Sequence, residues 1–193
     1  AEIYRAFVVT IIRRFEASAS DRALYHWPVN TAKAFAEIAP AWRIAPQCAG
    51  DLGTRMADYF RQAFDEGCER VLLIGSDSPN LPTDYIEQAF AALSRNDVVL
   101  GPTTDGGYYL VGARDQVPNI FKDVAWSTPA VWEETQRNIH RAGLSRHVLP
   151  PWYDVDDRQD LVRLSEDLQD TEEPPLRTLA EVIQPYCRPE RQP

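Results

Sequence analysis

Aspartates that follow short apolar runs are the residues of this sequence whose type and position suggest chemistry. Asp77 comes shortly after the apolar run 71–74, in the stretch "VLLIGSDSPNLP". A carboxylate at that place is a hard oxygen ligand of the kind that Mg²⁺ and Mn²⁺ favour. A structural interpretation is open as well, because Ser76, Asp77, Ser78 and Pro79 are all good turn formers.

A second candidate is Asp105, which precedes two glycines and an apolar run in "GPTTDGGYYLVG". Paired glycines allow the backbone to approach a ligand closely. The alternative is a tight hairpin, since Asp-Gly is a strong hairpin signal.

Asp154 and Asp156 form a third candidate in "WYDVDDRQDL", where Val155 separates them. In an extended chain, alternate side chains point to the same side. Two close carboxylates repel each other unless a cation compensates them. The alternative is a pair of solvated loop aspartates before a helix that Asp157 caps.

The fourth candidate is a glycine-rich helix start in "PQCAGDLGTRM". Gly50 and Gly53 flank Asp51 and Leu52, and backbone N–H groups at such a start can receive an anion or a nucleobase carbonyl. Arg55 lies one turn further and can bind a phosphate with two hydrogen bonds. The alternative is a capped helix with a surface arginine.

Helical and strand-like patterns alternate along the chain and position these residues. The expected helices cover residues 2–16, 31–39, 51–67, 128–143 and 176–183, and two more begin at 83 and 157. The expected strands cover residues 22–29, 42–47, 70–75, 97–102, 106–112 and 146–150. The alternation predicts one α/β domain over residues 1–193, a three-layer α/β/α sandwich with a mostly parallel mixed sheet and a flexible tail from about 185. Ligands of such sheets bind at the carboxyl ends of strands, where Asp77 would end a central strand.

The composition excludes several classes of protein. A net charge of −9 argues against nucleic-acid binding, which needs a basic surface. No apolar run approaches the roughly 18 residues of a membrane span. Three widely spaced cysteines, Cys48, Cys68 and Cys187, form no disulfide framework and predict a reducing, cytoplasmic compartment.

The order of the motifs resembles a known family. "PQCAGDLGTRM", "VLLIGSDSPNLP", "DVVLGPTTDGGYYLVG", "VAWST" and "YDVDDRQDL", within residues 4–165, are together similar to an uncharacterised bacterial family. That family is described as glycosyltransferase-like with the GT-A fold, the fold of nucleotide-diphospho-sugar transferases, and some members are assigned to arsenosugar biosynthesis. Molybdenum-cofactor and 2-phospho-L-lactate guanylyltransferases are more distantly similar in fold.

The resemblance implies roles for the motif residues. It makes Asp77 and Asp156 metal ligands, with Asp154 assisting. It places Asp105, Gly106 and Gly107 in the segment that lines the sugar or acceptor pocket. It places the nucleotide base and phosphates beside Gly50, Asp51, Gly53 and Arg55.

One departure from the family pattern bears on binding. Members of the family begin with a strand and a basic loop that ends in Lys-x-Arg-Leu and holds the nucleotide diphosphate. That unit would precede Ala1 and is not in this sequence. The expectation is therefore a GT-A-like fold whose first strand is missing, with weak nucleotide binding.

The expected function is that of a transferase. It would use Mg²⁺ or Mn²⁺ to move a sugar from a nucleotide sugar to a small-molecule acceptor, and Asp105 would position or deprotonate the acceptor hydroxyl. One alternative is a nucleotidyltransferase that acts on a phosphorylated small molecule. Another is a non-catalytic ligand-binding remnant without the phosphate loop. Fold similarity alone does not decide among the three.

Overall fold

The computed structural model describes residues 2–187, and every expected helix and strand is present with shifts of a few residues at the ends. The helices are α1 (Glu2–Arg14), the 3₁₀ turn η1 (Val29–Thr31), α2 (Ala32–Ile38), α3 (Leu52–Asp65), α4 (Thr83–Ala92), α5 (Val131–Arg141), α6 (Arg158–Asp167) and α7 (Pro174–Cys187). The strands are β1 (Ala23–His26), β2 (Arg43–Pro46), β3 (Arg70–Ile74), β4 (Val98–Pro102), β5 (Tyr108–Arg114) and β6 (Arg146–Val148). Of the predicted tail, residues 185–187 belong to α7, and residues 188–193 lie outside the described part.

The described strands form two sheets. β1 and β2 pair in parallel, and the second sheet has the order β3-β5-β4-β6. β5 runs antiparallel to both neighbours, while β6 is parallel to β4. The reversal at β5 follows from the connection, because the few residues between Pro102 and Tyr108 can close a hairpin but cannot make a parallel crossover.

β3, which leads to Asp77, borders the four-stranded sheet instead of lying in its centre as the apolar run indicated. Its far side faces a cavity of about 260 Å³ that β1, β2 and α3 also line. On that side the backbone carbonyl of Leu72 accepts a hydrogen bond of 3.1 Å from the Tyr59 hydroxyl of α3. An apolar sequence therefore does not by itself show that a strand lies at the centre of its sheet, because helices can bury the side chains of a strand at the edge as well.

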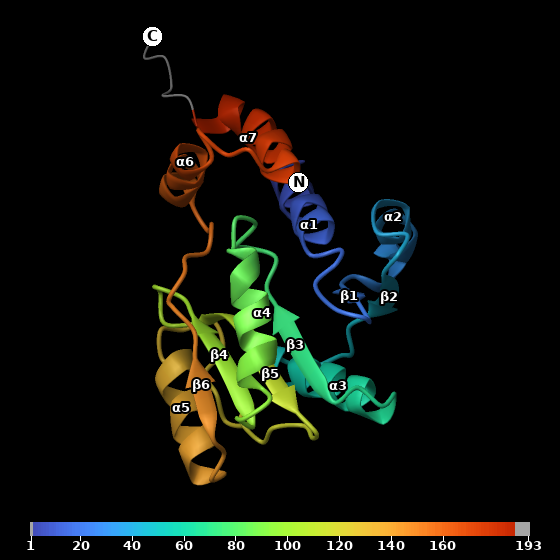
Figure 1. The fold of residues 1–193 in the computed structure, drawn as a ribbon, viewed down its shortest axis with the longest axis vertical. Helices are drawn as coiled ribbons and strands as arrows, with labels where there is room; N and C mark the ends of the chain where they lie inside the picture. The colour runs from blue at the N-terminus through green and yellow to red at the C-terminus, as the bar shows by residue number, and fades with distance from the viewer. Residues whose placement is uncertain (1, 188–193) are drawn as a thin grey trace.

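Helices cover both faces of the four-stranded sheet, which gives the expected three layers (Figure 1). On one face, Phe60 of α3 and Ile139 of α5 pack with Val98 and Val111. On the other face, α4 and the end of α1 pack with Val99, Leu110 and neighbours. The strand residues alternate between the two faces because successive side chains of a strand point in opposite directions.

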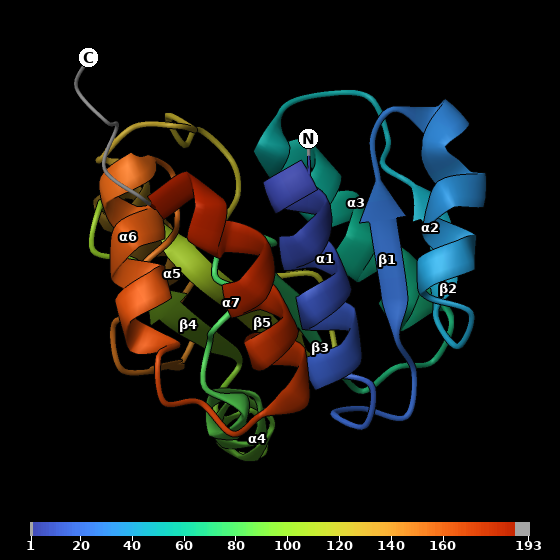
Figure 2. The ribbon, with the colours of Figure 1, turned by 90° about the horizontal axis from the view of Figure 1, so that it is seen from above.

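α1 connects the parts of the molecule. It contacts α7 along its length, and the two helices lie side by side (Figure 2). Phe7 packs with leucines of α6 and α7, while Val8 and Ile12 pack against α2 and the β1–β2 sheet. Ile11 reaches the core under α4. One amphipathic helix with several apolar sides thereby joins both sheets to the helices α6 and α7.

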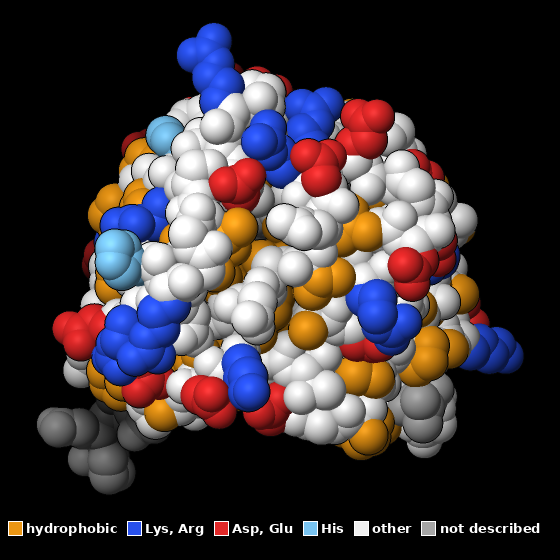
Figure 3. All heavy atoms as spheres, turned by 90° about the horizontal axis from the view of Figure 1, so that it is seen from below, with side chains coloured by type: hydrophobic (Ala, Val, Ile, Leu, Met, Phe, Trp, Pro, Cys, Tyr) orange, Lys and Arg blue, Asp and Glu red, His pale blue; other side chains and the backbone are white. Residues whose placement is uncertain are grey.

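Three features of the described residues bear on the expectations from composition. None of the described helices combines the length and the apolar character that a membrane crossing demands. The three cysteines are free thiols. On the face seen from below in Figure 3, Lys and Arg side chains are interspersed with Asp and Glu. That face therefore carries no basic stripe of the kind that nucleic acids bind.

Candidate functional site

Three carboxylates from two distant segments converge at one place. Asp105, Asp154 and Asp156 each offer an oxygen atom, and these three atoms lie within 4.8 Å of one another. Asp105 belongs to the turn between β4 and β5, and the other two belong to the segment between β6 and α6. Three oxygen ligands at this spacing suit a hard divalent cation.

The turn between β4 and β5 fixes Asp105. Its Oδ1 accepts hydrogen bonds from the Thr103 hydroxyl and, at 3.1 Å, from the backbone N–H of Gly107. Gly106 has φ of +100°, and a Cβ there would lie 2.5 Å from the Pro129 carbonyl oxygen, so only glycine fits. The Asp-Gly-Gly segment thus makes the tight turn and also presents its carboxylate to the cluster.

The segment before α6 separates its acidic residues into two groups. Asp157 caps α6 by accepting hydrogen bonds from the N–H groups of Gln159 and Asp160, and the Asp160 carboxylate in turn accepts a hydrogen bond from the N–H of Asp157. This capping box uses both side chains structurally. Asp154 and Asp156 stay outside it and join the cluster, as their alternation with Val155 predicts.

Asp77 lies beside the three carboxylates but is not one of the group within 4.8 Å. Its backbone carbonyl accepts a hydrogen bond of 2.8 Å from the N–H of Val155. The Ser76 hydroxyl donates a hydrogen bond of 3.3 Å to its carboxylate. The structure therefore brings Asp105, and not Asp77, into the group of three carboxylates, with Asp77 adjacent to it.

The electrostatics of the cluster favour a cation. Burial, followed by the negative charges of Asp105, Asp156 and Asp77, raises the pKa of Asp154 to about 7. Burial, followed by the charges of Asp77 and Asp105, also raises the pKa of Asp156. A divalent ion would compensate these charges and favour the ionised forms of Asp154 and Asp156.

A buried hydrogen-bond network joins the loop of Asp77 to the segment of Asp154. The Ser78 hydroxyl donates to the Tyr153 carbonyl at 3.0 Å, and the Asn80 amide donates to the Tyr153 hydroxyl at 2.7 Å. The Trp152 indole N–H donates to Asn80 Oδ1 at 3.2 Å, and the Tyr153 hydroxyl donates to Asp167 at 2.5 Å. Sequence reasoning missed Asn80 and Tyr153, because the hydrogen bonds that join their two segments connect residues more than 70 positions apart.

Arg14 of α1 is a second support that the sequence did not reveal. Its side chain is 4% exposed and pairs with Glu173 at 2.7 Å. Its NH1 group donates hydrogen bonds of 2.8 Å to the carbonyls of Pro79 and Leu81. The sequence around Arg14 does not indicate these contacts, because basic residues are common in the last turn of a helix and the partners of Arg14 are far away in the chain. The contacts fix the loop after Asp77 to α1 and α7.

In the predicted nucleotide segment, Asp51 and Arg55 have structural partners. Asp51 caps α3 by accepting a hydrogen bond of 2.8 Å from the N–H of Thr54, and hydrogen bonds from Thr54 lower the pKa of its carboxyl group. Arg55 donates from Nε to the Gly50 carbonyl at 3.0 Å and from NH1 to Gln47 at 3.2 Å. A phosphate contact of Arg55 stays a prediction, and its described contacts hold the loop before α3.

Local packing accounts for the glycines of this segment. Gly50 has φ of +124°, in the left-handed region that glycine tolerates. A Cβ on Gly53 would lie 2.7 Å from the Phe121 carbonyl oxygen and from Trp126 Nε1. Trp132, further along the same connecting segment, donates a hydrogen bond of 2.8 Å to the carbonyl of Gly106. The segment 121–132 is therefore a wall shared by the start of α3 and the turn of Asp105.

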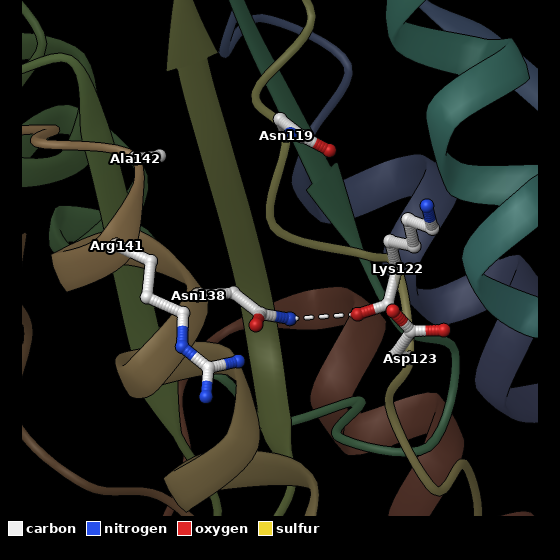
Figure 4. Close-up of a pocket in the computed structure, with 6 residues that line it drawn as sticks. All are labelled: Asn119, Lys122, Asp123, Asn138, Arg141 and Ala142. Carbon is white, nitrogen blue, oxygen red and sulfur yellow. Dashed lines mark hydrogen bonds between the residues drawn. The ribbon is translucent and has the colours of Figure 1, made fainter.

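A separate hollow of about 210 Å³ lies at the end of α5 and contains none of the predicted carboxylates (Figure 4). Lys122, Asp123 and Arg141 line it and are exposed. The amide of Asn138 donates to the carbonyls of Ile120 and Lys122. The Asn138 amide therefore binds backbone carbonyls, and the charged side chains are exposed. Because none of the clustered carboxylates lines this hollow, we do not count it as part of the site.

Comparisons with known proteins agree with this picture. A crystal structure from Desulfovibrio desulfuricans, of a protein described as a "putative nucleotide-diphospho-sugar transferase", is 31% identical to the chain and superposes with a TM-score of 0.85. The match covers 95% of this chain and 84% of that one. No curated protein matches the chain.

These findings confirm the GT-A-like fold, while the likeness to guanylyltransferases and the link to arsenosugar biosynthesis stay predictions. A family model matches residues 10–128, which include four of the five quoted motifs, among them the one that contains Asp105. With more than half of its length matched, the chain belongs to the family described as "Uncharacterized protein conserved in bacteria (DUF2064)".

Proposed function

We propose that the protein is a divalent-metal-dependent transferase that takes its donor group from a nucleotide-activated sugar. The observation that carries the proposal is the convergence of the Asp105, Asp154 and Asp156 carboxylates within 4.8 Å, next to Asp77. The description of the Desulfovibrio desulfuricans relative as a nucleotide-diphospho-sugar transferase supports the same class of reaction.

The donor atoms fit Mg²⁺ or Mn²⁺. All are carboxylate oxygens, the ligands that hard cations favour. Burial is the main cause of the raised pKa of Asp154, and the neighbouring anions, which a cation would compensate, add to it. We assign Asp154 and Asp156 as ligands, with Asp77 adding negative charge beside them. A bound ion would neutralise the charge that develops on the leaving nucleoside diphosphate.

Asp105 is the residue that we assign to the acceptor as well as to the ion. The hydrogen bonds from Thr103 and Gly107 to Oδ1 hold its carboxylate in one orientation. A carboxylate held in this way can fix an acceptor hydroxyl beside the ion and accept its proton. The acceptor would then be a small molecule with a free hydroxyl group.

The test is a product assay with a panel of nucleotide sugars and Mn²⁺. The proposal expects release of a nucleoside diphosphate, a requirement for the metal, and loss of at least about 100-fold in rate for Asp156→Asn, since removing one charge-stabilising group typically costs that much. Asp115→Asn is the matched control. This aspartate is exposed, lies in the loop after β5 with φ of +62°, and tolerates asparagine there.

Two outcomes would replace the proposal. Release of pyrophosphate from a nucleoside triphosphate and a sugar phosphate would identify a nucleotidyltransferase. Metal-dependent nucleotide binding without turnover of any substrate pair would favour a ligand-binding protein.

A further inference from the structure

Tyr4 of α1 contacts the loop that carries Asp77. Its side chain lies in the first turn of the helix and is 53% exposed. Its hydroxyl oxygen lies 3.0 Å from the hydroxyl oxygen of Ser76, which is 72 positions further along the chain. Neither residue is buried, so packing in the core does not account for this contact. The contact places the first turn of α1 directly beside Asp77.

The chemistry of the three groups determines the direction of their hydrogen bonds. The Ser76 hydroxyl has a single hydrogen atom, and an ionised carboxylate can only accept. Ser76 donates this hydrogen to Asp77 Oδ1 at 3.3 Å, so its oxygen accepts the hydrogen bond that the Tyr4 hydroxyl donates. These groups form a Tyr4–Ser76–Asp77 relay, in which each hydrogen bond polarises and strengthens the next.

Repulsion from the neighbouring carboxylates acts against the observed position of Asp77. Burial first, and then neighbouring charges that include Asp77, raise the pKa of Asp154 and of Asp156. This repulsion is mutual, and Asp77 is exposed, so like charge favours an Asp77 side chain that is turned away into solvent. The hydrogen bond from Ser76 opposes that movement because it holds Oδ1 of Asp77.

The helix that carries Tyr4 is itself fixed. α1 packs along α7 (Figure 2). Near its other end, the buried Arg14 donates a hydrogen bond to the carbonyl of Pro79, in the loop after Asp77. The helix therefore contacts this loop at two places on either side of Asp77 in the sequence, and Tyr4 presents its hydroxyl from a rigid support.

We propose that Tyr4 is a positioning residue of the candidate site, which acts through Ser76 to keep the Asp77 carboxylate beside the ion. The inference rests on the proposed function, because it requires a cation at the three clustered carboxylates. A negative charge held near a cation raises the affinity for that cation by Coulomb attraction, even without direct contact. Asp77 adds to the affinity in this way as long as the relay holds it in place.

The test is a calorimetric titration with Mn²⁺ alone. Tyr4→Phe retains the ring and removes the hydroxyl, and it should weaken Mn²⁺ binding about 2- to 10-fold, the range that one hydrogen bond of ordinary strength provides. Ser76→Ala should weaken binding at least as much. In an Asp77→Asn background, Tyr4→Phe should have no further effect, because the charge that it positions is gone. A merely structural role of Tyr4 would persist in that background.

Tyr186→Phe is the matched control. Tyr186 of α7 is also an exposed tyrosine, with 42% of its surface accessible. Its hydroxyl donates a hydrogen bond of 2.8 Å to Glu2, in the same first turn of α1 that contains Tyr4. The control removes an equivalent hydroxyl and tests for a general loosening of the helix start. It should leave Mn²⁺ affinity unchanged.

The outcomes separate the relay from the proposed function. If the wild-type protein binds Mn²⁺ and Tyr4→Phe binds it equally well, the relay is refuted and the proposed function stands. Equal weakening by Tyr4→Phe with Asp77 and with Asn at position 77 would also refute the relay, and so would weakening by Tyr186→Phe. If the wild-type protein does not bind Mn²⁺, the proposed function fails and the relay fails with it.

Discussion

Burial and neighbouring negative charges together raise the pKa of the Asp154 carboxyl group strongly. The pKa of its carboxyl group is about 7 in the folded protein, against 3.8 for an unperturbed aspartate. The folded state therefore binds more protons than the unfolded state between about pH 4 and pH 7. By linkage, the free energy of unfolding falls as pH rises through this range and stays lower above it.

In metal-free protein, Asp154→Asn should remove this decrease in the free energy of unfolding with rising pH. At pH 8 the variant should be more stable than the wild type by about 1 to 2 kcal/mol, a value discounted for the solvent screening of a half-buried group. At pH 4 the two proteins should be close, since the wild-type carboxyl group is then protonated. Urea denaturation with EDTA at both pH values measures the difference. A variant that is less stable than the wild type at pH 8 would show that Asp154 makes a favourable interaction as an anion.

At the scale of elements, the network of Asn80 and Tyr153 determines how the loop after β3 meets the segment before α6. Asn80 is 9% exposed and Tyr153 is 3% exposed. Their hydrogen bonds, together with that from Ser78, are buried contacts between these two loops. Buried side-chain hydrogen bonds of this kind specify one relative position, because a shifted loop would leave polar groups without partners.

Asn80→Ala should therefore affect both stability and metal binding. It leaves the Trp152 indole N–H without its acceptor, which should cost about 1 to 3 kcal/mol of unfolding free energy. It should also weaken Mn²⁺ binding by severalfold, because Asp77 is no longer held against Val155. Denaturation and Mn²⁺ titration measure the two effects.

Ile139→Val is the control for simple destabilisation. Ile139 is a fully buried residue of α5, and the substitution should lower the free energy of unfolding by about 0.5 to 1.5 kcal/mol. It should leave Mn²⁺ affinity unchanged. If Asn80→Ala also left Mn²⁺ affinity unchanged, the network would be structural only.

For the whole molecule, Arg14 is a buried residue whose hydrogen bonds join segments 65 to 159 residues apart in the sequence. It links α1 to the loop after Asp77 and to Glu173, just before α7. Its guanidinium satisfies two backbone carbonyls that face inward. A single buried charge thereby connects the first helix, the site and the last helix.

Arg14→Met should destabilise the protein by about 2 to 4 kcal/mol, because it leaves two carbonyls and a partly buried carboxylate without their donor. The adjacent Arg13 is exposed, so Arg13→Met should change stability by less than about 0.5 kcal/mol. Urea denaturation of the two variants tests the pair. Equal stabilities would mean that the contacts of Arg14 contribute nothing net to folding.

The amino-acid sequence by itself determined the order and type of the elements and the pairing of Asp154 with Asp156. These features depend on local periodicity and on short-range contacts, such as the cap that Asp157 makes on α6. The tight turn at Asp105 was also readable, because Asp-Gly is a strong hairpin signal and glycine tolerates the positive φ that Gly106 adopts.

Only the tertiary structure decided which carboxylates meet and which supports hold them. It brought Asp105 to Asp154 and Asp156, left Asp77 beside them, and placed β3 at an edge of its sheet. It turned Arg55 toward the loop before α3 and buried Arg14. The physical reason is the same in each case. The partner of each of these side chains depends on how segments far apart in the sequence pack together, and local sequence patterns do not contain that information.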